Sequence, residues 1–136
     1  MQLNTHLNFD GQCRAAFEYY EKHLGGKVTM MMTYGDSPMA AHVSPGDHRK
    51  ILHATFELGT QRLTGADAPA GRYDKPQGLA VLLSSDSKEE ANRIFEALTD
   101  GGTVQMPLQE TFWALRFGML VDRFGTPWMV NCGRPV

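Results

Sequence analysis

Cysteine, long apolar runs and an excess of charge of one sign are all scarce in this sequence. Its two cysteines are too few for a disulfide framework, so we expect both thiols to be reduced. The longest uninterrupted apolar run, Leu79 to Leu83, is far shorter than a membrane span. The formal net charge of −2 provides no basic surface for nucleic acid. We therefore predict no nucleic-acid partner and no membrane partner.

The beginning of the sequence also lacks the pattern of an export signal, because no basic segment is followed by an apolar one. We therefore predict a cytoplasmic location. With 136 residues, 42% of them hydrophobic and 21% charged, the chain has the composition of a soluble globular protein. Its length fits one ordinary domain, or two small modules that share a core.

Apolar residues in the first half of the chain follow patterns that predict one helix among several strands. Residues 3–9 place mainly apolar side chains on one face and polar side chains on the other, as a strand does. From about Gln12 to Leu24, apolar residues recur at spacings of three and four, which predicts a helix ended by two glycines. Further strands are predicted over 28–34, 50–58 and 61–65, with an aperiodic loop over 35–48.

The second half has the same order of elements, after a linker over residues 68–77 that is rich in proline, glycine and charge. A strand is predicted over 79–83. Ser85-Asp86-Ser87 then supplies the N-cap of a second helix, whose first turn carries two glutamates as the helix dipole favours. One further strand over 104–108 and a last, aromatic hairpin are predicted beyond this helix.

The aromatic hairpin, Leu108 to Cys132, holds both tryptophans and three of the seven phenylalanines. Asp122-Arg123-Phe124-Gly125 has the composition of a type I turn, and Pro127 suits the start of the returning strand. A hairpin this aromatic, with the lone acid Glu110 nearby, is typical of a wall of a ligand pocket.

The two halves of the chain repeat each other. Gly25-Gly26 and Gly101-Gly102, which each end a predicted helix, lie 76 residues apart, and Gly59-Thr60 recurs 66 residues later as Gly125-Thr126. Each half therefore has the plan β-α-β-β-β. One such module cannot cover its own sheet, so two must pair.

From this repeat we predict a single α+β domain over residues 1–136. It would consist of a first module over 1–67 and a second over 78–136. The strands would form an open, curved, antiparallel-rich mixed sheet with the helices outside, and a ligand is expected on its inner surface.

This duplicated plan resembles the vicinal oxygen chelate superfamily, which includes glyoxalase I, extradiol dioxygenases and the fosfomycin and bleomycin resistance proteins. The motifs NFDGQCRAAFEYYEKHLGG and QETFWALRFGMLVDRFGTPWMVNC are similar to those of its PhnB-like branch, and the resemblance covers nearly the whole chain. It implies the glyoxalase/bleomycin resistance fold and a homodimer. Some relatives carry a ubiquinone methyltransferase label, but this sequence shows no glycine-rich loop between a strand and a helix to hold an adenosyl cofactor.

The resemblance also implies one divalent metal ion, held by His or Gln on the first strand and Glu on the last strand of each module. The corresponding positions here are Asn4, Leu63, Met129 and one of the residues 78–80. Such side chains do not hold a divalent cation, so we predict no metal and no other cofactor. The alternative is Zn, Ni, Mn or Fe held by His6 with His53 or Glu57, which requires His6 to lie on a neighbouring strand.

Seven residues are predicted to form the functional site. Glu110 is the candidate acid or base, if its aromatic neighbours desolvate it; the alternative is a carboxylate that accepts backbone N–H groups at a strand bend. His6 is either a donor to the ligand or a core histidine, and the tryptophans are either stacking walls or core. The predicted ligand-binding residues are Asn4, His6, His53, Trp113, Trp128 and Met129.

Two functions follow from these residues. The first is a metal-free protein that binds a small organic molecule in an aromatic cleft. The second is an enzyme of the same superfamily, either a metal-dependent lyase, transferase or dioxygenase, or a metal-free acid/base catalyst that uses Glu110.

Overall fold

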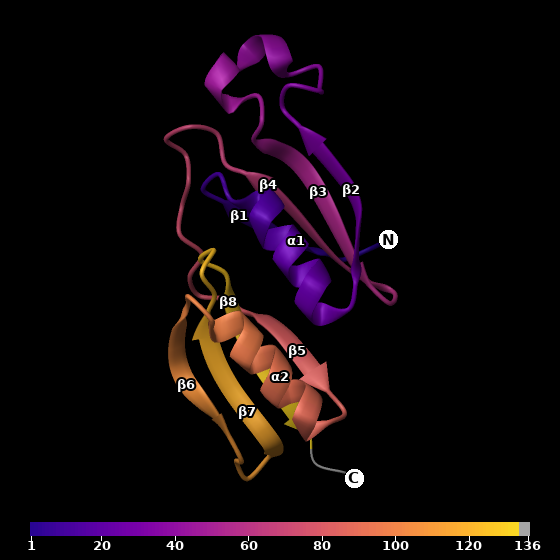
Figure 1. The fold of residues 1–136 in the computed structure, drawn as a ribbon, viewed down its shortest axis with the longest axis vertical. Coiled ribbons are helices and arrows are strands. Elements are labelled where there is room, and N and C mark those ends of the chain that lie inside the picture. The colour runs from indigo at the N-terminus through magenta and orange to yellow at the C-terminus, as the bar shows by residue number, and fades with distance from the viewer. Residues whose placement is uncertain (134–136) are drawn as a thin grey trace. The chain divides into compact units, whose positions relative to one another are not determined.

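The computed structural model describes residues 1–133, which fall into two compact units. The first unit is Met1–Asp74, and the second begins at Lys75. Each unit has one four-stranded sheet and one long helix that lies across that sheet (Figure 1). The predicted fold class, two β-α-β-β-β modules, is therefore confirmed. The exact module bounds, 1–67 and 78–136, stay a prediction, and residues 134–136 of the second lie outside the described part.

The first unit contains a mixed sheet in the order β1-β4-β3-β2. Its first strand runs parallel to its last, with Thr5 opposite Leu63, and the other pairs are antiparallel. Two short 3-10 helices lie in the loop between β2 and β3. The elements are β1 Thr5–Phe9, α1 Cys13–Leu24, β2 Lys27–Thr33, η1 Ala40–His42, η2 Pro45–Asp47, β3 Ile51–Leu58 and β4 Gln61–Asp67.

The second unit repeats this topology in the order β5-β8-β7-β6, again with its first strand parallel to its last. Its elements are β5 Val81–Ser85, α2 Lys88–Thr99, β6 Thr103–Gln109, β7 Ala114–Val121 and β8 Pro127–Gly133. Within residues 1–133 no helix combines the length and the apolar character that a membrane crossing requires.

Each helix buries one apolar stripe against its own sheet. The ring of Phe17 in α1 lies 6.0 Å from that of Phe9 and 6.4 Å from that of Phe56, both edge-on. In α2 the buried residues recur at spacings of three and four. These stripes are the ones that the sequence predicts. They comprise Cys13, Ala16, Phe17, Tyr20 and Leu24 in α1, and Ala91, Ile94, Phe95 and Leu98 in α2.

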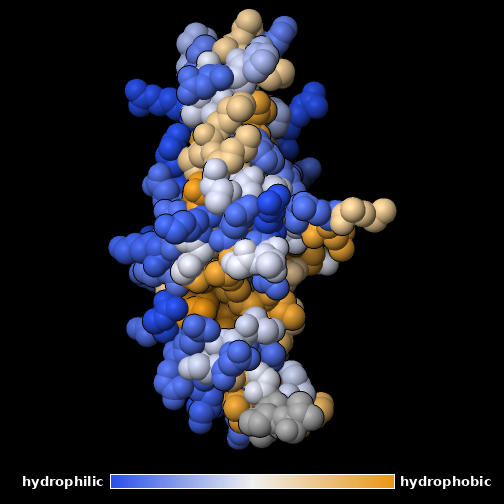
Figure 2. Space-filling view, turned by 90° about the vertical axis from the view of Figure 1, so that its right-hand side faces the viewer, coloured by the Kyte–Doolittle hydropathy of each residue, from blue (hydrophilic) through white to orange (hydrophobic). Residues whose placement is uncertain are grey.

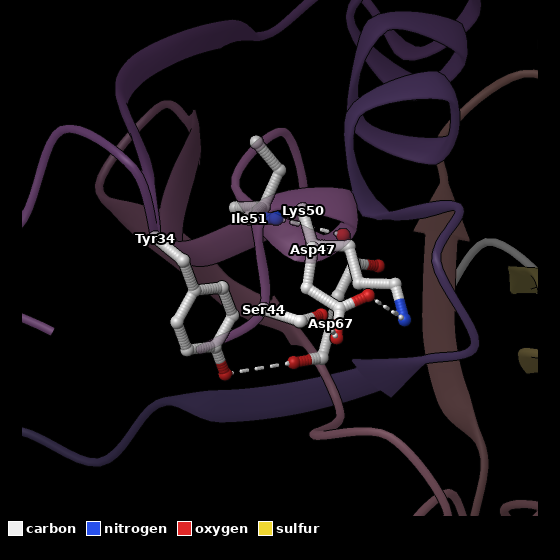
Figure 3. Close-up of polar contacts among 6 residues, drawn as sticks. All are labelled: Tyr34, Ser44, Asp47, Lys50, Ile51 and Asp67. Carbon is white, nitrogen blue, oxygen red and sulfur yellow. Dashed lines mark hydrogen bonds and ion pairs between the residues drawn. The ribbon is translucent and has the colours of Figure 1, made fainter. Parts of the chain in front are cut away.

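The two helices begin with different caps. Ser87 Oγ accepts a hydrogen bond from the backbone N–H of Glu90 (3.2 Å), as the sequence predicts for α2. Gln12 gives α1 no side-chain cap. Instead the buried carboxylate of Asp67, at the end of β4, accepts from the N–H of Cys13 (2.9 Å) and from the N–H of Ile51 (2.8 Å; Figure 3). One side chain thereby joins α1, β3 and β4.

Three predicted segments need correction. The first strand begins at Thr5 rather than at residue 3, since its pairing with β4 begins with Thr5 opposite Leu63, and Leu3 is fully exposed. The first strand of the second unit is Val81–Ser85 rather than 79–83. The loop over 35–48 contains η1 and η2, whose three residues each are too few to show an apolar period.

Candidate functional site

A row of polar side chains crosses the sheet of the first unit on the face away from α1. A Cβ built on Gly65 would lie 2.7 Å from the ring of Phe17, so Gly65 faces the helix and its neighbour Thr64 faces the opposite, open side. His6 of β1 lies opposite Thr64, and its Nδ1 is 2.7 Å from Thr64 Oγ1. Thr64 in turn lies opposite Thr55 of β3. The open face thus has an imidazole and two hydroxyls in line.

His53 extends this row along β3. Its Nε2 lies 3.4 Å from Thr55 Oγ1. Partial burial is the main cause that lowers the pKa of His6, the nearby His53 lowers it further, and a hydrogen bond with Asn8 opposes both. His6 therefore favours its neutral form, in which a ring nitrogen bonds Thr64.

The remaining residues predicted for this face are less well placed. Asn4 precedes β1 and is exposed, so it is outside the sheet. Glu57 forms an ion pair with Arg62 (2.9 Å). The predicted alternative of a metal shared by His6 and His53 requires neighbouring strands, but β4 separates β1 from β3. That condition is not met.

The strand register corrects the positions at which the superfamily resemblance places metal ligands. Leu63 pairs with Phe56 and faces α1, so the open-face residue of β4 opposite His6 is Thr64. In the second unit the matching pair on β5 and β8 is Leu82 and Met129, not a residue within 78–80. Leu63 and Met129 each lie four residues after a turn glycine, Gly59 or Gly125. This spacing reaches the open face only in the second unit, because the turn before β4 has two residues and the turn before β8 has five.

These four side chains do not suit a divalent cation. His6 offers one imidazole nitrogen and Thr64 a neutral hydroxyl, whereas Leu82 offers nothing and Met129 a weak thioether. Within residues 1–133, no group of three or more His, Cys, Asp or Glu side chains is placed to hold a metal ion. The donor set of the superfamily is therefore not present at its expected positions.

The open face of the second unit carries an apolar cavity of about 560 Å³. Met129 and Met119, which lie opposite each other on β8 and β7, form part of its floor. The segment before β5 forms a wall, where Leu79 is 58% exposed. On the molecular surface, hydrophobic side chains gather around a hollow (Figure 2). The polar groups in the lining are Lys75, Gln77 and Gln105.

An aromatic cluster stands at the β6–β7 turn of the same unit. Trp113 is 48% exposed and packs edge-on against Phe112 (ring centroids 4.7 Å apart) and Phe117 (5.4 Å). Phe117 alternates with Gly118, whose Cβ would meet the α2 residue Phe95, so Phe117 lies on the open face with Met119. Trp113 therefore covers part of the open face that carries the cavity.

Glu110 lacks the desolvation that its predicted acid/base role requires, and Trp128 has the core position that was predicted as the alternative to a stacking wall. Glu110 is exposed just after β6, and Phe112 is 89% exposed, so these aromatic neighbours do not bury the carboxylate within its unit. Trp128 is 1% exposed, and its indole N–H donates to Asp122 Oδ2 (2.8 Å). Trp128 belongs to the core beneath α2 and does not line the cavity.

This chain is similar in sequence to known proteins. A family model described as 3-demethylubiquinone-9 3-methyltransferase matches residues 1–131. Protein YjdN from Escherichia coli (strain K12) is 34% identical over 140 residues, which cover 96% of this chain and 95% of that protein. The chain belongs to this family, the PhnB-like family.

Solved structures show the fold of this PhnB-like protein in other chains. Protein PA1353 from Pseudomonas aeruginosa is 47% identical, with a TM-score of 0.89 and 99% of each chain covered. The PhnB protein from Bacillus cereus is 22% identical (TM-score 0.83, covering 98% and 100%). A glyoxylase/bleomycin resistance protein/dioxygenase domain from Frankia sp. EAN1pec is 16% identical (TM-score 0.65, 98% of each chain covered). The predicted superfamily fold is confirmed.

Sequence reasoning missed the residues of the site that depend on strand pairing. Thr64 and Thr55 join the polar row only because β4 lies between β1 and β3, an order that alternation within single strands does not reveal. Leu82 was part of the apolar run that indicated β5, but its partner on β8 could not be identified without the register. The signals that did indicate the row were the polar faces of residues 3–9 and of the predicted strand 50–58, which carries His53 and Thr55.

Proposed function

We propose that this protein binds a small organic molecule on the open face of its second unit and does so without a divalent metal. The apolar cavity beside Met129 is the observation that carries the proposal. Its volume lies within the range of roughly 300–1,000 Å³ that is usual for small-molecule sites. Two methionines, which adapt to the shape of a ligand, and a few polar groups complete the lining.

The exposed ring of Trp113 indicates that the ligand has a planar group. This ring stands on Phe117 and offers a flat apolar surface on the open face. Stacking on such a ring stabilises an aromatic ligand by about 1 kcal/mol beyond the area it buries. The proposed ligand is therefore a planar, largely apolar molecule with one or two hydrogen-bonding groups for Gln77 and Gln105.

A thermal-shift screen of aromatic metabolites tests this function. A ligand at 100 times its Kd should stabilise the protein by about 2.7 kcal/mol, seen as a saturable rise in Tm. Met129→Glu would put a carboxylate into the apolar lining and should weaken binding at least tenfold. Met39→Glu, on an exposed methionine of the other unit, is the matched control. Equal binding by both variants, or no saturable ligand, would refute the proposal.

The metal-free part of the proposal has its own test. It rests on the donor set His6, Thr64, Leu82 and Met129, which lacks a carboxylate. Elemental analysis of protein purified without chelator should find zinc, nickel, manganese and iron well below one atom per chain. A stoichiometric divalent ion would overturn this part and favour a metal-dependent lyase, transferase or dioxygenase.

A second candidate function is metal-free acid/base catalysis, and the polar row of the first unit favours it. Desolvation lowers the pKa of His6 and so favours its neutral form, and Thr64 orients its ring, which are properties of a general base. Glu110 remains the other proposed acid or base. Methyl transfer is not proposed, because the turns before α1 and α2 have no glycine-rich loop for an adenosyl cofactor.

Two variants distinguish binding from catalysis once a ligand is known. If His6 or Glu110 is catalytic, His6→Gln or Glu110→Gln should bind the ligand normally and lose turnover. If both variants convert the ligand at the wild-type rate, the acid/base proposal fails, while the binding proposal stands or falls on the Met129 test.

We also propose that the protein is a cytoplasmic homodimer. Large apolar side chains that are exposed in the single chain support the dimer, notably Leu79, Leu82 and Phe112. Two free buried cysteines are consistent with a reducing compartment.

A further inference from the structure

The first unit has a polar cavity that is separate from its open face. It holds about 520 Å³ and lies where α1 begins, β2 ends and β3 begins. Two of its residues are arginines from different elements, one in the first turn of α1 and one just before β3. The lining residues are Arg14, Thr33, Gly35, Asp36, His48 and Arg49.

The walls of this cavity are joined by the buried residue Asp67. Its carboxylate accepts from the N–H of Cys13, next to Arg14, and from the N–H of Ile51, close to Arg49. The hydroxyl of Tyr34, which follows Thr33, donates to the backbone carbonyl of the same aspartate (3.2 Å; Figure 3). Asp67 is only 2% exposed, so these bonds are shielded from water. The three walls are therefore held before any ligand arrives.

Backbone bonds close the loop that carries the remaining lining residues. The N–H of Gly35 donates to the carbonyl of His48 (2.9 Å), and the N–H of Tyr34 donates to that of Lys50 (2.9 Å). A Cβ on Gly35 would lie 2.9 Å from the Cβ of His48, so this close approach requires glycine. His48 Nε2 bonds the carbonyl of Ala40 (2.9 Å), which ties η1 to the same region.

The charges around the cavity leave its two guanidinium groups available. Neither Arg14 nor Arg49 forms an ion pair with any residue in the described part of the chain. The neighbouring Lys50, by contrast, pairs with Asp47 (3.1 Å; Figure 3). Asp36 is the one carboxylate in the lining, so the formal charge of the lining is positive when His48 is neutral.

We propose that this cavity binds a small anion that carries a phosphate or carboxylate group. A guanidinium presents two parallel N–H donors that match the oxygens of either group, and two such groups on fixed walls can hold one anion from two sides. The hydroxyl of Thr33 lies in the same lining. The site goes beyond the proposed ligand cavity, because it belongs to the first unit and takes charged rather than apolar chemistry.

Titration of the full-length protein with inorganic phosphate, and separately with acetate, tests this site. Backbone amide NMR signals of Gly35 and Asp36, and the side-chain Nε–H signals of Arg14 and Arg49, should shift and saturate. Sodium chloride at matched ionic strength should produce no saturating shift, because ionic screening changes gradually with salt and does not fill a binding site. Saturation by phosphate only, or by acetate only, would identify which anion the site prefers.

Substitutions then assign the effect to the two arginines. Arg49→Gln should weaken binding roughly tenfold or more, since each charge-assisted bond is stronger than a neutral one. Arg72→Gln, which removes an exposed arginine outside the cavity, should change nothing, and Asp36→Asn should strengthen binding. The same spectra show whether each variant is folded, and Arg49→Lys offers a second, charge-conserving variant. Equal affinities for Arg49→Gln and Arg72→Gln, or shifts that never saturate, would overturn the proposal.

Discussion

Two buried aspartates at the residue scale serve structure rather than chemistry. Asp122 Oδ1 accepts from the N–H groups of Phe124 and Thr126 (both 2.9 Å), and its Oδ2 accepts from Trp128. These bonds shape the turn between β7 and β8. Asp67 likewise accepts two backbone N–H groups, from Cys13 and Ile51, and so joins elements that are far apart in the sequence. In both cases a carboxylate with several lone pairs satisfies donors that would otherwise be buried without partners.

Asp67→Asn should therefore destabilise the first unit. The amide has one acceptor oxygen where the carboxylate has two, so either Cys13 or Ile51 would face an N–H₂ group. We expect a loss of about 2 kcal/mol in the free energy of unfolding. Urea denaturation measures it, with the exposed Asp74→Asn as control. If both variants unfold at the same urea concentration, Asp67 is not the anchor described above.

Cys13 makes stability depend on alkaline pH. Burial, followed by the nearby Asp67, raises the pKa of its thiol from 9.0 to about 12, against a smaller opposing effect of Arg14. Between these values the folded chain keeps a proton that the unfolded chain releases, so stability is full below pH 9 and falls as pH rises toward 12. The free energy of unfolding should fall by up to about 1.4 kcal/mol for each pH unit in this range.

Urea denaturation between pH 7 and pH 10.5 measures this slope. Cys13→Ala removes the titrating thiol, so its stability should fall less steeply with pH than that of the wild type, whatever its stability at pH 7. Parallel curves for the two proteins would contradict the assignment of the slope to Cys13.

Single residues of the site were predicted unevenly, because side-chain periodicity is local and pairing is not. His6 and His53 were placed on polar strand faces correctly, since alternation within one strand decides the face. Leu63 was assigned to the wrong face because the two turn lengths differ, and a shift of one residue moves a side chain to the other side of a sheet. The surroundings of Glu110 and Trp128 depend on contacts that no motif specifies.

At the scale of elements, the two units use the same device to join helix and sheet. A Cβ on Gly26 would lie 2.4 Å from the carbonyl oxygen of Glu57, and a Cβ on Gly102 would lie 2.4 Å from that of Val121. Each glycine follows a left-handed one: Gly25 is the C-cap of α1, and Gly101 follows Asp100, the C-cap of α2. The chain can thus pass directly over the end of the third strand of its unit.

Gly26→Ala and Gly102→Ala should each destabilise the protein by about 1–3 kcal/mol, because the added methyl group overlaps a backbone atom that cannot rotate away. Gly46→Ala is the matched control, since nothing lies within 4 Å of its Cβ and its φ is not positive. We expect it to be within about 0.5 kcal/mol of the wild type. Thermal unfolding of the three variants compares them directly. If Gly102→Ala is as stable as the wild type, the close packing of this glycine against the third strand is not repeated in the second unit.

The repeat of these glycine pairs also explains why the order of elements could be predicted so fully. Each helix lies between a strand and a glycine pair, and both helices have a buried stripe of period near 3.6. Strand ends were predicted less well. Leu79 and Ala80 are apolar like the strand that follows, yet they line the cavity instead of joining β5, whose pairing with β8 begins only at Val81 opposite Trp128.

At the scale of the whole molecule, the sheet edges and the exposed apolar side chains of each unit favour association with a second chain. Each four-stranded sheet has two edge strands, and such edges favour pairing with other strands. Phe112 is 89% exposed and Leu82 55% exposed, although both are large and apolar. Burial of one such side chain stabilises an interface by roughly 1.5–3 kcal/mol, and a two-fold axis doubles the contribution of every residue.

We therefore expect light scattering after size exclusion to give twice the chain mass of 15.1 kDa. Phe112→Ser should shift the equilibrium toward the monomer if this ring lies in the dimer contact, because the variant loses apolar area from both subunits at once. Met39→Ser, an exposed methionine in the other unit, controls for a general change in surface polarity. A single-chain mass that persists as protein concentration rises would contradict the homodimer. The exposed apolar groups would then be available to the ligand alone, and the cavity beside Met129 would have to bind its ligand as part of a monomer.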